Sequence, residues 1–383
     1  HTGLFGGIAK DRAMLAAETA TADVERAFAE TLDGRPGPVL VDLPTDVSGR
    51  TCADPAATPP SSPRRAPSSS DIEAARDLIA SFDAPVIIAG SDVLRDGAQD
   101  ELLALADTLD AAVLAGMDAR GVISEDHPRF AGVFAGLASP DVLASRILAQ
   151  ADGVIVAGMD ALMTEAPWQS ELPVCELSAR PDCTTLCPKP RVAVTGDLRK
   201  ALATLSSGLR GGGFGVPRIE AIRHEIAPRF ERPADATFTA QDIIAITRDI
   251  LPRDGLLFSE TGVVVLMLEH LWNVYEPDTF FGTTAGRTMG LTIPALLGAA
   301  LACPDRSMIG IGADGSTLMR LGELEVFARM GIAVPLVVVN DACLGTIKAR
   351  PKSRGLPPCG LDSTTVDFAA AARACGVLGV TVD

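Results

Sequence analysis

Short apolar runs alternate with stretches of helical spacing along most of this chain, and this alternation constrains the fold more than any other feature. The runs are rich in Val, Ile, Leu and Ala, and Gly or Pro bounds most of them. A run that is apolar on both faces is typical of a strand buried in a parallel sheet. Strands that alternate with helices form right-handed βαβ units. The sequence therefore predicts an α/β protein with successive open parallel sheets and helices on both faces.

The apolar runs fall into two blocks after a short N-terminal piece. The middle block has predicted strands at 85–89, 111–115, 153–157, 174–177 and 192–194. Helical patterns accompany them at 71–81, 97–108, 140–150 and 197–206. The last block has predicted strands at 256–258, 308–311 and 335–339, with helical patterns at 239–251, 293–301 and 316–330. The N-terminal piece has one helix at 21–32 and one strand within 38–44.

Two segments have the composition of linkers. Residues 51–70 are rich in Pro and Ser, and residues 208–217 are rich in Gly, and neither composition supports a packed core. They divide the chain into an N-terminal piece (1–50), a Rossmann-like middle domain (71–207) and a C-terminal domain (218–383). One helix and one strand cannot bury each other, so we expect the first piece to be the end of a domain whose front is absent from this chain.

The charge balance argues against some classes of partner. The chain has 49 acidic and 33 basic residues, a net charge of -16, which predicts neither nucleic-acid binding nor binding to an anionic membrane. No apolar run approaches the roughly 18 residues of a membrane span, and the first residues do not resemble a signal peptide. Its four His and eight Cys form no local motif with a nucleophile. We expect a cytoplasmic protein and, if it is an enzyme, a cofactor that carries the chemistry.

Two aspartates follow predicted parallel strands. Asp314 comes after the run 308–311, and Asp341 comes after the run 335–339, 27 positions later. One helix lies between these runs, so the strands are expected to be neighbours with both carboxylates in one crevice. Two such carboxylates are suited to a hard divalent cation. Gly315 and Ser316 begin the helix and suit a phosphate, which predicts a metal–diphosphate site. The alternative for Asp-Gly-Ser alone is plain capping of that helix.

These motifs resemble a known family. ADGS (313–316) and NDACLG (340–345) resemble the GDG and NN elements of thiamine diphosphate-dependent enzymes of the acetolactate synthase and 2-oxo acid decarboxylase type. GRPGPVLVDLPTDV (34–47) is similar to the last strand of the family's pyrimidine-binding domain. SETG (259–262) and GRTMGLTIPALLGAALA (286–302) are similar to the opening of its diphosphate-binding domain. The resemblance covers nearly the whole chain. It implies the thiamine diphosphate-binding fold with an incomplete C-terminal end.

The resemblance implies thiamine diphosphate and Mg²⁺ as cofactors. The metal ligands would be the side chains of Asp314 and Asp341, with the backbone carbonyl of Cys343. The residues implied for cofactor binding are Glu260, Thr261, Gly262, Thr288, Met289, Gly315, Ser316, Leu344 and Gly345. Met289 would be the apolar residue that holds the cofactor bent, although it also suits a core. For Glu260 the alternative is a carboxylate exposed at a strand end.

The chain departs from the family pattern at several positions. Ala313 replaces the first Gly of GDG, which requires a negative φ at that residue. Asp341 replaces Asn and adds a negative charge, which we expect Arg287 to offset. The family's catalytic Glu has no match here, so the catalytic residue is unknown.

The expected function is that of a thiamine diphosphate- and Mg²⁺-dependent enzyme that decarboxylates or ligates small 2-oxo acids, as a homodimer or homotetramer. The sequence TIKARPKSRGLPP (346–358) favours a catabolic relative over the biosynthetic synthase. One alternative is an inactive, cofactor-binding partner subunit. Another is a nucleotide-binding module whose middle block holds FAD near Gly90, Gly116 and Gly158. No G-x-G-x-x-G follows those strands, which favours a structural role for the glycines.

Overall fold

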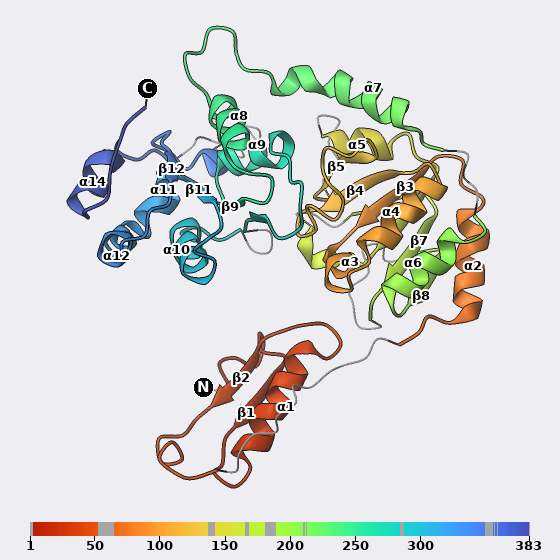
Figure 1. Ribbon diagram of the computed structural model, residues 1–383, viewed down its shortest axis with the longest axis horizontal. Helices are drawn as coiled ribbons and strands as arrows, with labels where there is room; N and C mark the ends of the chain where they lie inside the picture. Colours follow the sequence, from red (N-terminus) through yellow and green to blue (C-terminus); the bar gives the residue numbers. More distant parts are fainter. Residues whose placement is uncertain are drawn as a thin grey trace.

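Three units built on parallel strands make up the protein (Figure 1). The computed structural model describes residues 3–52, 65–136, 142–164, 168–180, 189–209, 213–283, 287–348 and 359–382, with the single residues 211, 355 and 357. Every strand pair in these described ranges is parallel, apart from an isolated antiparallel bridge between Cys343 and Asp362. The predicted fold class, α/β with successive open parallel sheets, is confirmed.

The middle unit is a six-stranded sheet of order β5-β4-β3-β6-β7-β8. The strands are β3 (Pro85–Ala89), β4 (Ala112–Gly116), β5 (Phe130–Phe134), β6 (Gly153–Ala157), β7 (Val174–Ser178) and β8 (Val192–Thr195). The helices are α2 (Ser69–Ile79), α3 (Ser91–Arg95), α4 (Gln99–Thr108), α5 (Leu143–Leu148), α6 (Leu198–Ser206) and α7 (Val216–Ile226). Apolar residues of α2, α4 and α6 cover one face of the sheet, and those of α5 and α7 cover the other. This strand order is that of a doubly wound sheet.

Strand β5 was not predicted from the sequence. It pairs with β4 through a register shift between Val113 and Ala115, and Gly132 within it has φ +114°. A bulge with Gly at positive φ interrupts the regular spacing of a strand. The run FAGVF is nonetheless apolar and buried throughout, but no helix separates it from β4, so it does not fit the alternation of strands and helices on which the prediction depended.

The C-terminal unit is a four-stranded sheet of order β10-β9-β11-β12. Its strands are β9 (Leu256–Ser259), β10 (Phe280–Phe281), β11 (Met308–Ala313) and β12 (Leu336–Val339). Helices α8 (Ala240–Ile250) and α9 (Val263–Leu271) pack on one face, and α10 (Thr292–Ala302), α12 (Leu324–Met330) and α14 (Phe368–Ala374) pack on the other. Helix α8 begins with a capping box formed by Thr239 and Asp242, which satisfies the free N–H groups of its first turn.

The helix predicted over 316–330 is divided. The structure has a short helix α11 (Asp314–Leu318), a 3₁₀ turn (Leu321–Glu323) and then α12. Gly322 lies in the turn, and Gly in a helix interior is unfavourable because it loses more backbone entropy than other residues. The division leaves Asp314 as the first residue of α11, where the pocket described below begins.

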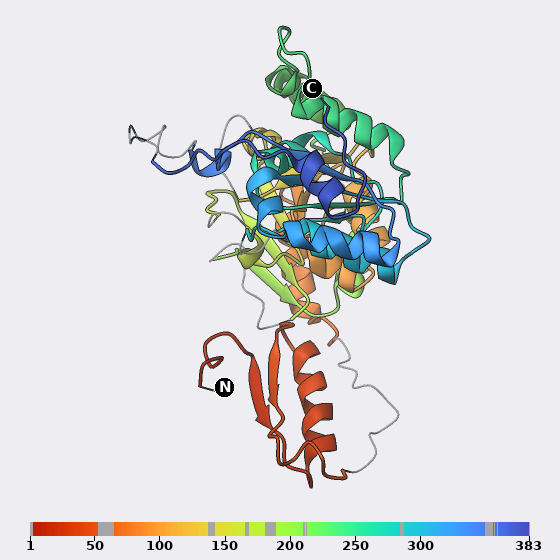
Figure 2. The ribbon, with the colours of Figure 1, turned by 90° about the vertical axis from the view of Figure 1, so that its left-hand side faces the viewer.

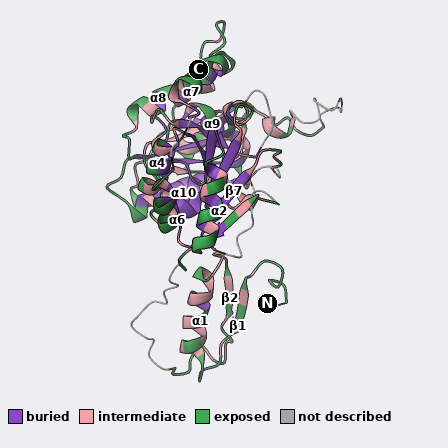
Figure 3. Ribbon diagram, turned by 90° about the vertical axis from the view of Figure 1, so that its right-hand side faces the viewer, coloured by how far each residue is buried: buried purple, intermediate pink, exposed green. Residues whose placement is uncertain are grey.

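The N-terminal unit consists of β1 (Asp11–Met14), α1 (Ala20–Leu32) and β2 (Val39–Asp42), with β1 and β2 paired. It lies apart from the two larger units in both ribbon views (Figures 1 and 2), and Arg35 forms an ion pair with Asp160 of the middle unit at 2.7 Å. Figure 3 shows that its residues are mostly exposed or half-buried, whereas buried residues concentrate in the larger sheets. Strand β1, with the sequence DRAM, has no apolar run that predicts it.

Helix α7 begins at Val216, inside the predicted linker 208–217, and packs against the middle sheet. Phe214, Ile219, Ile222 and Ile226 are buried in the same apolar cluster as Val86 and Ile88 of β3. The proposed division into domains stays a prediction. Across the ranges that the structure describes, no helix is both long and apolar enough to cross a bilayer.

Candidate functional site

A pocket lies at the carboxyl edge of the four-stranded sheet. Strands β11 and β12 are paired in register, with Ala313 opposite Val339, so the residues that follow both strands meet at this edge. The pocket is lined by Thr261, Gly262, Val263, Val264, Met289, Ala313, Asp314, Gly315, Ser316, Val339, Asp341, Cys343, Leu344, Gly345, Thr346 and Ile347. The prediction that the two aspartates follow neighbouring strands is confirmed.

The first turn of α9 forms one wall of this pocket. Gly262 precedes the helix in an extended conformation, and a Cβ atom at Gly262 would lie 3.0 Å from Cβ of Ala313. This close approach brings the N-terminal end of α9 against β11. Backbone N–H groups at a helix N-terminus lack partners within the helix and favour anions. The backbone N–H groups of this wall are therefore suited to bind a phosphate.

Asp314 forms the floor of the pocket. Its side chain is buried at 4% exposure, and its Oδ1 accepts a hydrogen bond from N–H of Gly315 at 2.7 Å. Ala313 before it has φ −96°, so a side chain fits where the related enzymes have Gly. Ser316 is fully buried and its hydroxyl donates to the carbonyl of Thr261 at 3.3 Å. This bond ties the start of α11 to the segment before α9.

Asp341 lies opposite, on the exposed side of the pocket. Its Oδ1 accepts a hydrogen bond from N–H of Cys343 at 3.3 Å, and Ala342 between them has φ +51°. This left-handed residue turns the chain sharply after β12. Burial and, secondarily, the Asp341 carboxylate raise the pKa of the Cys343 thiol. A raised pKa disfavours the thiolate, so Cys343 is better suited to offer its carbonyl than to act as a nucleophile.

Two glycines allow close approaches in the pocket that a side chain would disturb. A Cβ atom at Gly345 would lie 2.7 Å from Cγ2 of Val263 and 2.9 Å from Oδ2 of Asp341. A Cβ atom at Gly315 would lie 3.1 Å from Leu344 and 3.4 Å from Cε of Met289. The pocket thus has an apolar side formed by Met289 and Leu344 and an oxygen-rich side formed by the two aspartates.

Two of the predicted site residues do not line the pocket. Glu260 is buried at 1% exposure, and its Oε2 accepts a hydrogen bond from N–H of Leu291 at 2.5 Å. The alternative of a solvent-exposed carboxylate is therefore wrong for Glu260, which instead holds the start of α10. Thr288 is exposed, and its hydroxyl bonds only to the neighbouring carbonyl of Met289 in the part of the chain that the structure describes. The other ten predicted residues lie around one pocket; their roles stay a prediction.

The donor set of the pocket fits a diphosphate bound through a hard cation. Asp314 and Asp341 are the charged side chains of the described lining, and no basic side chain joins them there. An anionic ligand would be repelled by two carboxylates unless a cation lay between them. The Thr346 hydroxyl is buried and has no hydrogen-bond partner among the described residues. No three His, Cys, Asp or Glu side chains gather in those residues, so the cation would also need backbone or ligand oxygens.

The described contacts of Arg287 are with Glu269 and Met117, and the expected offset of the Asp341 charge stays a prediction. Its Nη2 lies 3.4 Å from Oε1 of Glu269 on α9 and 3.9 Å from Sδ of Met117 in the middle unit. Arg287 also has φ +46°, a conformation that costs a non-Gly residue about 1 kcal/mol. Sequence position alone suggested proximity to the pocket, but the side chain points toward the junction of the two larger sheets.

The glycines proposed for FAD binding serve close packing. A Cβ atom at Gly90 would lie 2.3 Å from the Gly158 carbonyl oxygen, and one at Gly116 would lie 2.8 Å from Sδ of Met159. Gly158 has φ +63°. These contacts support the structural interpretation, and FAD binding stays an untested alternative. Cys183 and Cys187, the closest cysteine pair in the sequence, lie outside the described residues.

Sequence reasoning missed part of the pocket. Val263 and Val264 at the start of α9, Val339, and Thr346 and Ile347 after the NDACLG motif also line it. The segment VVVLMLEHL is apolar almost throughout, and such a short run does not reveal whether it is strand or helix. The preceding Gly262 and the carboxylate-containing SETG motif were the available signals for a helix start.

The fold and the pocket define a class: an α/β protein with a doubly wound sheet, followed by a smaller parallel sheet with an acidic pocket at its carboxyl edge. Residues 260–383 match the family model described as thiamine pyrophosphate enzyme, C-terminal TPP binding domain. Residues 72–205 match the model described as thiamine pyrophosphate enzyme, central domain. Together the two matches cover most of the chain, and every pocket residue lies in the first. This chain belongs to the thiamine pyrophosphate enzyme family.

Named relatives are similar along most of the chain. The acetolactate synthase large subunit of Parasynechococcus marenigrum is 27% identical over 94% of this chain and 60% of that protein. A probable 2-ketoarginine decarboxylase of Pseudomonas aeruginosa is 28% identical over 92% of this chain and 63% of that protein. The chain thus spans about three fifths of the length of these relatives. The crystal structure of benzoylformate decarboxylase from Polynucleobacter necessarius shares the fold, with a TM-score of 0.79, 22% identity and coverage of 98% of this chain and 71% of that one.

Proposed function

We propose that this protein binds thiamine diphosphate together with Mg²⁺ and acts on small 2-oxo acids. The observation that carries the proposal is the pairing of β11 with β12, which places Asp314 and Asp341 around one pocket with the first turn of α9. Side-chain oxygens of both aspartates and the Cys343 carbonyl would hold the cation. The N–H groups at the start of α9 would bind phosphate oxygens. Met289 and Leu344 would contact the apolar part of the cofactor.

The bound cofactor would supply an ylid that adds to the oxo carbon and a site for the carbanion left after decarboxylation. This chain's residues would hold the diphosphate, neutralise it through the cation and keep the apolar part of the cofactor away from water. Relatives named as synthase and as decarboxylase are similar to about the same degree, which supports both decarboxylation and carboligation. The sequence after NDACLG favours a catabolic relative over the biosynthetic synthase.

We propose that the active unit is a homodimer or homotetramer. Exposed apolar side chains surround the pocket: Val263 (43%) and Leu266 (37%) on α9, Leu318 (41%) and Met319 (58%) at the end of α11, and Ile347 (50%). An apolar rim around a ligand pocket is typical of a surface that a protein partner covers. In the related enzymes a pyrimidine-binding domain of another subunit completes this site, and the N-terminal unit resembles the end of such a domain.

Binding and turnover test the proposal separately. We expect calorimetry to show saturable binding of thiamine diphosphate to the full chain with Mg²⁺, and little binding with EDTA in place of Mg²⁺. Release of carbon dioxide from a panel of 2-oxo acids would then distinguish an enzyme from an inactive partner subunit. Saturable binding without turnover would support the partner subunit, and an absorbance band near 450 nm in the purified protein would support the FAD alternative. Absence of binding with Mg²⁺ would contradict the proposal.

A further inference from the structure

A buried ion pair joins the middle sheet to helix α9. Nε and Nη2 of Arg120 donate to Oε1 and Oε2 of Glu125 at 2.8 and 2.7 Å. The Arg120 and Glu125 side chains are only 2% and 1% exposed. Both residues lie in the segment between β4 and β5 of the middle sheet. Two-point contact in the absence of water fixes the plane of the guanidinium group.

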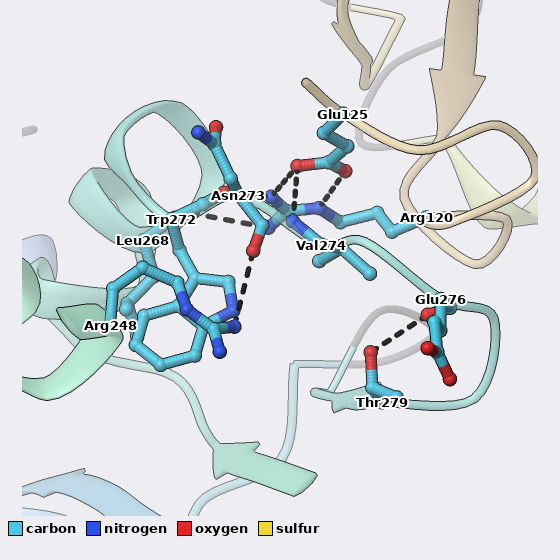
Figure 4. Close-up of polar contacts among 9 residues, drawn as sticks. All are labelled: Arg120, Glu125, Arg248, Leu268, Trp272, Asn273, Val274, Glu276 and Thr279. Carbon is cyan, nitrogen blue, oxygen red and sulfur yellow. Dashed lines mark hydrogen bonds and ion pairs between the residues drawn. The ribbon is translucent and has the colours of Figure 1, made fainter. Parts of the chain in front are cut away.

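The remaining donors of Arg120 reach the end of α9. Nη1 donates to the Leu268 carbonyl at 3.2 Å, and Nη2 donates to the Trp272 carbonyl at 2.5 Å. Figure 4 shows the guanidinium group between the Glu125 carboxylate and these backbone oxygens. The Leu268 carbonyl also accepts the N–H of Trp272, the C-cap residue of α9, at 3.2 Å, and the Trp272 carbonyl lies just beyond the helix. Carbonyl oxygens at a helix C-terminus attract cations. Arg120 therefore caps a helix of the C-terminal sheet from the middle sheet.

Glu125 forms two hydrogen bonds with Val274, which lies just after α9. Its Oε2 accepts from N–H of Val274 at 2.9 Å, and its own N–H donates to the Val274 carbonyl at 2.8 Å. Gly121 has φ +83°, and a Cβ atom there would lie 2.5 Å from the Glu276 carbonyl oxygen. The segment 120–125 is thus in contact with the residues at and after the end of α9, and its position determines where that end of the helix lies.

The opposite end of the same helix forms the pocket wall. Helix α9 has nine residues, so about 13 Å separates its ends. Gly262, Val263 and Val264 line the pocket at the first turn, and Arg120 binds the carbonyls at the last turn. A short helix moves as a rigid element, so a shift at one end displaces the other.

We propose that Arg120 is a positioning residue: by binding the last carbonyls of α9, it sets where the first turn of that helix lies in the cofactor pocket. This inference rests on the proposed function for its effect on the cofactor. According to this inference, a residue of the middle unit affects cofactor affinity although no residue of that unit lines the described pocket.

The test compares Arg120→Lys with a matched control in the full chain. Lysine keeps the charge but loses the planar set of donors. Arg129→Lys is the control, because Arg129, with a side chain 15% exposed, also pairs with carboxylates, at 2.6 Å from Asp107 and from Asp110, but only inside the middle unit. We expect Arg120→Lys to raise the Kd for thiamine diphosphate with Mg²⁺ about 2- to 30-fold. Arg129→Lys should stay within about twofold of the wild type.

Deuterium exchange of the cofactor-free protein provides a second readout. Arg120→Lys should speed amide exchange in α9 while the strands of the middle sheet keep their wild-type rates. Faster exchange everywhere, or an Arg120→Lys affinity equal to that of the wild type, would overturn the inference. If the lysine variant does not fold, Gly121→Ala displaces the same segment without changing a charge and should weaken binding in the same direction. If the wild type itself binds no cofactor, the proposed function fails, and the exchange pattern of α9 alone decides the positioning role.

Discussion

Nη2 of Arg287 lies 3.4 Å from Oε1 of Glu269, and this contact joins the segment before Met289 to helix α9. Glu269 is 8% exposed, and burial raises its pKa to about 7, although the charge of Arg120 acts in the opposite direction. A carboxyl group that changes charge near neutral pH therefore lies at the junction of the two larger sheets. Its partner, Arg287, holds a left-handed conformation within two residues of the pocket.

Glu269 should make the protein less stable as the pH rises. Because its pKa is about 7 in the folded chain against an ordinary 4.5, the folded state binds more protons between these values. The contribution of protonated Glu269 to the free energy of unfolding is complete below about pH 4.5 and is lost as the pH rises through 7. The loss should amount to about 2–3 kcal/mol. Glu269→Gln should match the wild type in urea unfolding at pH 5 and exceed it at pH 8. Parallel pH profiles for the two proteins would refute this assignment.

The two aspartates should differ in how they tolerate substitution. If both aspartates hold the cation as proposed, replacing Asp314 or Asp341 by Ala removes a charged ligand from a partly dehydrated site, which should cost about 2–4 kcal/mol, or roughly 30- to 1000-fold in cofactor affinity. Asp341→Asn should bind nearly normally, because the amide oxygen remains a donor and restores the residue usual in the related enzymes. Calorimetric titration with Mg²⁺ and thiamine diphosphate measures each variant. Unchanged affinity in both Ala variants would mean that these aspartates only cap local structure.

Gly345 should be required for metal binding rather than for folding. The added methyl of Gly345→Ala would lie 2.9 Å from Oδ2 of Asp341 and 2.7 Å from Val263, so the carboxylate must move. Displacing a metal ligand in this way should weaken Mg²⁺ binding about 10- to 100-fold. The matched control is Gly298→Ala in α10, where a Cβ atom would meet nothing within 4 Å. That variant should bind Mg²⁺ normally and gain about 0.5–1 kcal/mol of stability. Equal Mg²⁺ affinity in both variants would contradict the prediction.

The apolar rim should be needed for assembly. Met319 is 58% exposed just after α11. In the variant Met319→Glu, the added charge should shift the association equilibrium toward the monomer, as measured by sedimentation velocity. Its unfolding free energy should change by less than about 0.5 kcal/mol. Ile250→Glu is the control, since Ile250 is 75% exposed at the other edge of the sheet. A wild-type chain that sediments as a monomer, or equal dissociation in both variants, would argue against the proposed interface.

Local patterns were sufficient for most of the strands that are buried on both faces. The predicted strand at 85–89 matches β3 (Pro85–Ala89), in which every residue is buried, because such a strand must be apolar throughout. Strand β1, with the sequence DRAM, is mostly exposed or half-buried and pairs with β2. Strand β5 pairs with β4 through a register shift and contains Gly132 at positive φ. Strand β1 leaves no apolar spacing in the sequence, and β5 is apolar but has no helix between it and β4, so it does not follow the alternation of strands and helices.

The sequence by itself determined most of the buried strands of the two larger sheets and the meeting of Asp314 with Asp341, because a βαβ unit brings the ends of consecutive parallel strands to one edge. Only the tertiary structure decided that Glu260 is buried against Leu291, that Arg287 pairs with Glu269, and that Arg120 caps a helix some 148 to 152 residues away along the chain. Periodicity records which face of an element avoids water. It does not record which distant polar group completes a buried hydrogen bond, because that choice depends on how the sheets pack together.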